Sequence, residues 1–103
     1  MSKSKSVLIN VTERDILIGE PKRPRLCPIA RAVRRHFPGL DVGVDNSWVR
    51  VALFRGVFET VLPHSAVRFI RDYDEGYPVE PLRFRILVPE YSLRPKRRTT
   101  QGG

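Results

Sequence analysis

The chain contains too little of several residue types for some common kinds of protein. Its 103 residues include a single cysteine, Cys27, which excludes both an internal disulfide and a multi-cysteine zinc site. No stretch approaches the roughly 18 uninterrupted apolar residues of a transmembrane helix. No apolar segment follows the lysines at the N-terminus, so we expect no secretory signal. These absences favour one small intracellular domain.

Catalytic motifs are also missing. The sequence has no glycine-rich phosphate loop and no serine nucleophile elbow. Cys27 lies among arginines, which would favour a thiolate, but nothing in the spacing brings His36 or His64 to it as a base. The alternative, a small buried residue beside a helix start, is the more usual role for such a cysteine. We therefore predict a protein without enzymatic activity, with no catalytic residue, no metal site and no cofactor.

Acidic residues are few, and their scarcity is uneven along the chain. The sequence has 19 Lys and Arg against 11 Asp and Glu, a net charge of +8. Residues 1–40 hold nine cations and three acids, and residues 92–103 hold four cations and no acid. Residues 41–91 are slightly acidic. The excess positive charge therefore belongs to the two ends of the chain.

The densest basic block has no acid between Pro21 and Leu40. Such a block repels itself unless a polyanion or an acidic surface neutralises it. A solvated basic face is the alternative. We expect the cations of this block and of the C-terminal tail to bind an anionic partner: Lys22, Arg23, Arg25, Arg31, Arg34, Arg35, Arg94, Lys96, Arg97 and Arg98.

Hydrophobic periodicity predicts an α+β fold. We expect a mostly antiparallel sheet of about five strands with two helices on one face, and neighbouring first and last strands. The domain would span residues 7–91, between a flexible lead over residues 1–6 and a basic, flexible tail over residues 92–103. The strands are expected at 7–11, 41–44, 48–54, 57–61 and 82–88, and the main helices at 29–37 and 64–75.

The helix over 29–37 is central to the binding hypothesis. Proline at position 28 suits its first turn, and Thr12 to Asp15 resembles a capping box for a short helical turn before it. The 29–37 helix would turn its apolar side inward and Arg31, Arg34 and Arg35 outward. These three arginines are therefore expected at the centre of the binding face.

The aromatic residues have two interpretations. Core packing is the first, for Trp48, Phe54, Phe58, Phe69, Tyr73 and Phe84. The second is a modest stacking platform for bases on an exposed sheet face. Its contacts would be Trp48, Arg50, Arg83 and Arg85.

Two motifs resemble a group of small proteins encoded in tailed-phage and prophage genomes. They are the helix start Cys27-Pro28-Ile29-Ala30 and the helix that begins at Leu62-Pro63 and continues through Phe69-Ile70. The resemblance covers roughly residues 7–88 and implies the cytoplasm of a bacterial host, with virion association as the alternative. It carries no activity. This chain departs from the pattern in its basic loop and basic tail.

Three functions are compatible with these observations. The first is a non-enzymatic, phage-type accessory protein that binds nucleic acid or another polyanion through the basic loop, helix and tail. The second is a counter-defence protein that sequesters a nucleotide signal or blocks a host immune complex, which needs a discrete cavity and possibly an oligomer. The third is a structural component of a phage particle or other assembly. None involves a membrane.

Overall fold

The computed structural model describes residues 3–54 and 56–93. Within them the chain forms five strands, three α-helices and a final 3₁₀ turn, which confirms the α+β class. In chain order the elements are β1 (Ser4–Val11), α1 (Glu13–Ile18), α2 (Pro28–Arg34), β2 (Asp41–Val44), β3 (Trp48–Leu53), β4 (Gly56–Val61), α3 (His64–Asp74), β5 (Leu82–Pro89) and η1 (Glu90–Leu93).

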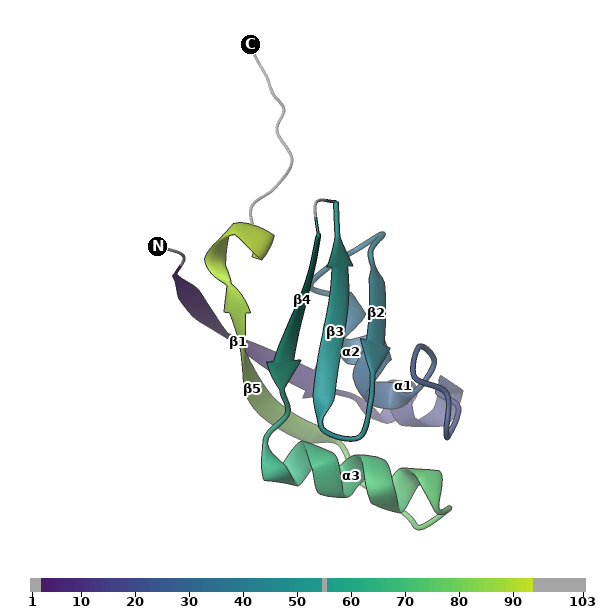
Figure 1. The fold of residues 1–103 in the computed structure, drawn as a ribbon. Helices are drawn as coiled ribbons and strands as arrows, with labels where there is room; N and C mark the ends of the chain where they lie inside the picture. Colours follow the sequence, from purple (N-terminus) through teal and green to yellow (C-terminus); the bar gives the residue numbers. More distant parts are fainter. Residues whose placement is uncertain (1–2, 55, 94–103) are drawn as a thin grey trace.

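The strands are all antiparallel, but they are divided between two sheets. β1 pairs with β5 in a two-stranded ribbon, and β2, β3 and β4 form a three-stranded sheet in chain order. The first and last strands are neighbours, as expected. β4 and β5 touch without forming a ladder, and the ribbon crosses the three-stranded sheet at an angle (Figure 1). The five antiparallel strands that we predicted are therefore confirmed, but they form two sheets instead of one.

β1 begins earlier than the sequence indicates. The flexible lead was expected to extend to residue 6, yet the ladder with β5 starts at the pair Ser4 and Pro89. The amide of Glu90 also donates to the carbonyl of Lys3 at 2.7 Å, which continues the pairing by one more hydrogen bond. Backbone hydrogen bonds to a neighbouring strand thus order a polar segment that has no hydrophobic pattern of its own.

The two short helices have the caps that the sequence predicts. The Thr12 side chain accepts from the amide of Asp15, and the Asp15 carboxylate accepts from the amide of Thr12, which completes the capping box of α1. α2 starts with Pro28 and ends at Arg34, three residues before Phe37, where we expected its end. Its last residues tighten into turns that place Phe37 in the core even so.

The core lies between the two sheets and the helices. α2 contacts both β1 and β2 and thereby joins the sheets, while α3 lies across one end of the three-stranded sheet (Figure 1). Phe37 from the end of α2 meets Phe58 of β4 edge to face, with ring centroids 5.7 Å apart. Buried aliphatic side chains on the inner faces of β1, β2, β3 and β5 complete this core, and Thr60 is buried beside Phe58 on β4.

Two aromatic residues depart from the expected core. Trp48 is 47% exposed, and Phe54 is 87% exposed beside the tip of the β3–β4 hairpin. Trp48 is the first residue of β3, and Phe54 follows its last residue. Val49 and Val51 of β3 point inward, so the alternation of side chains along the strand turns Trp48 outward.

Among the described residues, no helix is long and apolar enough to cross a membrane.

Candidate nucleic-acid interface

Arg31 of α2 and Arg35 at its C-terminal cap both contact a buried carboxylate. Arg35 donates to both oxygens of Asp15, from Nη1 to Oδ1 at 2.7 Å and from Nη2 to Oδ2 at 2.6 Å. Arg31 adds a longer contact from Nε to Oδ1 at 3.4 Å. Asp15 is only 1% exposed, so these guanidiniums compensate a charge that the core could not otherwise hold.

Asp15 stays ionised because of these contacts. Burial by itself raises the pKa of a carboxyl group, but the hydrogen bonds from Arg35 and Thr12 outweigh it and hold the pKa of Asp15 at about 2, below its ordinary value of 3.8. Arg35 also donates to the carbonyl of Asn10 at 2.8 Å, which attaches the end of α2 to β1. Arg31 and Arg35 are thus occupied within the fold.

The loop before α2 is tied down in the same way. Arg25 forms a bidentate ion pair with Asp41 of β2, from Nε to Oδ1 at 2.7 Å and from Nη2 to Oδ2 at 3.1 Å. The hydrogen bond from Arg25 lowers the pKa of Asp41. Arg34 donates to the carbonyl of Arg25 at 2.8 Å. Arg23 lies 3.8 Å from Glu20, and both of these side chains are exposed.

The expectation that Arg31, Arg34 and Arg35 form a free basic face therefore needs correction. The sequence between Pro21 and Leu40 has no acid, but Asp15 precedes the block and Asp41 follows it, and the fold brings both to it. Tertiary contacts supply the neutralisation that the local sequence lacks. Of the six cations in the block, only Lys22 makes neither an ion pair nor a side-chain hydrogen bond among the described residues.

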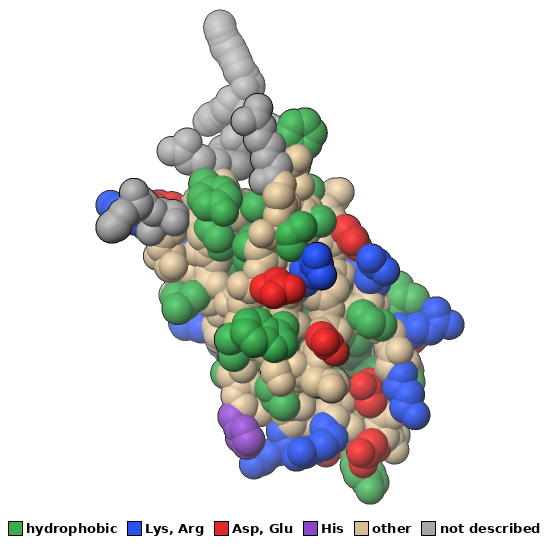
Figure 2. All heavy atoms as spheres, viewed as in Figure 1, with side chains coloured by type: hydrophobic (Ala, Val, Ile, Leu, Met, Phe, Trp, Pro, Cys, Tyr) green, Lys and Arg blue, Asp and Glu red, His purple; other side chains and the backbone are tan. Residues whose placement is uncertain are grey.

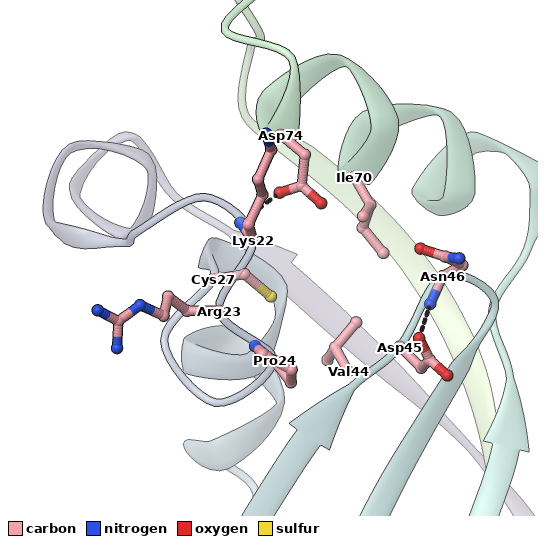
Figure 3. Close-up of a pocket in the computed structure, with 9 residues that line it drawn as sticks. All are labelled: Lys22, Arg23, Pro24, Cys27, Val44, Asp45, Asn46, Ile70 and Asp74. Atoms are coloured by element: carbon pink, nitrogen blue, oxygen red, sulfur yellow. Dashed lines mark hydrogen bonds between the residues drawn. The ribbon is translucent and has the colours of Figure 1, made fainter.

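A small cavity lies beneath this loop (Figure 3). It has a volume of about 190 Å³, and the Cys27 sulfur points into it while the Arg23 guanidinium points away. Lys22 takes a left-handed backbone conformation here, with φ of 61°, and its amide donates to Asp74 at 2.8 Å. Asp45 and Asp74 both line the cavity, and two carboxylates make it a poor site for a phosphate group.

Cys27 itself is a helix cap. Its sulfur accepts from the amide of Ala30 at 3.4 Å, its side chain is buried, and burial raises the pKa of the thiol. The alternative of a small buried residue beside the helix start is confirmed. No hydrogen bond joins Cys27 to His36 or His64, and the described residues contain no cluster of three or more potential metal ligands.

The expected stacking platform is divided between the two sheets. Trp48 and Arg50 point outward from β3 on the three-stranded sheet, where Arg50 lies 3.9 Å from Glu59. Arg83 and Arg85 point outward from β5 on the ribbon. Figure 2 shows the three-stranded face, on which hydrophobic, basic and acidic side chains are mixed. The four residues do not form one basic surface.

The outer face of the ribbon carries two exposed arginines, Arg83 and Arg85. Cross-strand pairing places Asn10 beside Arg83, Leu8 beside Arg85, and Ser6 beside Leu87, all exposed. Arg85 donates to the Ser6 hydroxyl at 3.4 Å, and no carboxylate lies within 4.0 Å of either arginine among the described residues. The alternation of Arg83 and Arg85 was visible in the sequence, but the contribution of Ser6 and Asn10 depends on the pairing.

The remaining predicted site residues, Arg94, Lys96, Arg97 and Arg98, lie outside the described residues. The tail that contains them follows η1, directly after β5. Comparison of the chain with protein-family models, with curated proteins and with solved structures gave no significant match.

Proposed function

We propose that this protein binds nucleic acid, without catalysis, through the outer face of the β1–β5 ribbon. One observation supports this site over the basic loop. The guanidiniums of Arg25, Arg31 and Arg35 are neutralised by carboxylates within the fold, whereas those of Arg83 and Arg85 are exposed with no acidic partner among the described residues. A phosphate group competes with no internal anion there.

The chemistry of the ribbon fits a double helix better than a single strand. Its outer face offers guanidinium, amide and hydroxyl groups from Arg83, Arg85, Asn10 and Ser6, all of which donate to phosphates or base edges. The one aromatic residue in the two strands, Phe84, is buried, so bases have no platform on which to stack. An antiparallel two-stranded ribbon has the width that the major groove admits.

The C-terminal tail extends this interface by sequence. Four cations lie between residues 94 and 98, and the chain reaches them from the end of β5 through a single 3₁₀ turn. They would add phosphate contacts without sequence preference. Removing residues 94–103 is expected to lower the slope of log affinity against log salt by up to about four phosphate equivalents.

Salt titrations of binding test the proposal. A fluorescent duplex and the matching single strand are titrated with the full chain, and affinity is followed by anisotropy over a range of NaCl concentrations. The double variant Arg83→Gln/Arg85→Gln should weaken duplex binding about tenfold and lower the salt slope by about two. The wild type should bind the duplex more tightly than the single strand.

A matched control separates the ribbon from net charge alone. Arg68→Gln/Arg71→Gln removes the same charge from the exposed side of α3 and should leave affinity nearly unchanged. If this control weakens binding as much as the ribbon variant, or if the wild type binds neither oligonucleotide, the proposal is wrong.

A further inference from the structure

The outer face of the β2–β3–β4 sheet carries an exposed apolar patch that the proposed function does not use. Trp48 is 47% exposed and its cross-strand partner Val61 is 57% exposed, while Val57, beyond the Arg50–Glu59 pair on the same face, is 49% exposed. Tryptophan and arginine on an exposed apolar face are typical of the residues that dominate protein interfaces. Figure 2 shows this face, which no other described part of the chain covers.

The charges on the face argue against a polyanion as its partner. Arg50 has Glu59 as its direct cross-strand neighbour, at 3.9 Å. Both residues line a hollow on this face together with Asp45 and Arg25. Phosphates that approached Arg50 would also meet these carboxylates. A partner for this face must instead present both signs of charge in register.

The chain itself has a surface that meets this requirement. The outward residues of β3 and β4 form three cross-strand pairs: Trp48 with Val61, Arg50 with Glu59, and Ala52 with Val57. We infer that two copies of the chain pack face to face through this sheet, with a two-fold axis parallel to the strands and midway between β3 and β4. That rotation places β3 of one copy over β4 of the other.

In this arrangement each outward residue of β3 meets the copy of its own cross-strand neighbour. Arg50 lies over Glu59 of the second copy, and Ala52 lies over Val57 of the second copy, in both directions across the axis. Two identical patches can pack together only if the patch is complementary to itself. The Arg50–Glu59 pair meets this requirement, because the rotation places each positive charge over a negative charge of the other copy. Two sheets in this orientation pack as aligned layers about 10 Å apart.

The shape of the face agrees with the same axis. A hollow of about 310 Å³ lies beside Trp48, lined by Val61 of β4 and by Leu87 and Pro89 of β5. The rotation positions the indole of the second copy over Val61, at this hollow. The interface therefore has a protruding aromatic ring and a recess at matching positions, and the recess is lined by polar as well as apolar side chains.

Charge reversal with mixing tests the inference. In sedimentation velocity at increasing concentration, the nuclease-treated wild type should form dimers. Arg50→Glu and Glu59→Arg should each be monomeric, because each places like charges against each other. An equimolar mixture of the two variants should form a heterodimer, since every contact then joins opposite charges. Trp48→Ala should weaken the wild-type dimer at least about tenfold.

Controls separate association from folding and from general charge effects. The Arg50–Glu59 pair is exposed, and exposed ion pairs contribute little to folding, so both reversal variants should give native circular dichroism and nearly unchanged thermal unfolding. Arg68→Glu on α3 is the matched charge reversal and should dimerise as the wild type does. A wild type that stays monomeric, dimers that survive both reversals, or a mixture that stays monomeric would each overturn the inference. Nucleic-acid binding is measured separately, so failure of one proposal leaves the other intact.

Discussion

The Arg35 guanidinium donates two hydrogen bonds to the Asp15 carboxylate, at 2.7 and 2.6 Å, although the two residues are 20 positions apart in the chain. Asp15 caps the start of α1, and Arg35 stands at the end of α2, so the pair fixes the two helices against each other. Arg35 also holds the Asn10 carbonyl at the end of β1. One side chain that the sequence places on a basic, outward face is therefore a structural part of the fold.

Replacing Arg35 should destabilise the protein. Arg35→Ala leaves the buried carboxylate of Asp15 with the Thr12 amide and the longer contact from Arg31, and we expect a loss of about 2–3 kcal/mol in the free energy of unfolding. Arg34→Ala is the control, because Arg34 makes a single hydrogen bond to a loop carbonyl and should cost less than about 1 kcal/mol. Urea unfolding measures both. Equal stability of the two variants would contradict the assigned role of Arg35.

Acid should weaken the fold through Asp15. Its pKa is about 2 in the folded chain against an ordinary 3.8, so the unfolded chain takes up a proton first as the pH falls. The stabilisation, about 2 kcal/mol, is complete above the unfolded pKa and disappears as the pH falls from about 4 to 2.

Urea unfolding of Asp15→Asn across the same pH range checks this assignment. The variant should be less stable than the wild type near neutrality, and its stability should fall by about 2 kcal/mol less on acidification. Asp41→Asn is the comparison, because the pKa of Asp41 is also lowered by its arginine partner but its side chain is exposed. If the free energy of unfolding falls by the same amount on acidification in the wild type and in Asp15→Asn, other carboxylates cause the loss.

Gly19 should not tolerate a side chain. A methyl group there would lie 2.8 Å from the carbonyl oxygen of Asp15 and 2.9 Å from the ring of Pro28, closer than packed atoms allow. Gly19→Ala should therefore cost about 1–3 kcal/mol, because both obstacles belong to the backbone or to a rigid ring. Gly43→Ala is the control, since its methyl group would meet nothing within 4 Å. Thermal unfolding that ranks Gly43→Ala below Gly19→Ala would refute the close approach of α1 and α2.

Cys27 should be inert toward thiol reagents and replaceable by serine. It is 6% exposed and burial raises the pKa of its thiol, so native protein should react slowly and unfolded protein quickly. Serine also keeps an acceptor for the Ala30 amide, so Cys27→Ser should cost less than Cys27→Val, which loses the cap at about 1 kcal/mol. Fast labelling of the native protein, or greater stability of the valine variant, would count against this role.

The sequence alone determined most of the local structure. Alternating apolar residues located all five strands, Thr12 and Asp15 marked the capping box of α1, and Pro28 with Cys27 marked the start of α2. These signals depend on contacts within a few residues, where spacing translates directly into geometry. The placement of Cys27 as a small buried cap could be predicted for the same reason.

The tertiary structure decided which charges are free and which faces are exposed. Asp15 and Asp41 neutralise a basic block that no local acid balances, because folding brings them to it from outside. Ser6 and Asn10 join Arg83 and Arg85 only because β1 pairs with β5, which the sequence allowed without requiring. The division into two sheets likewise depends on whether β5 pairs with β1 or with β4. Such choices are set by the packing of the whole core, and the spacing of residues along one strand contains no information about them.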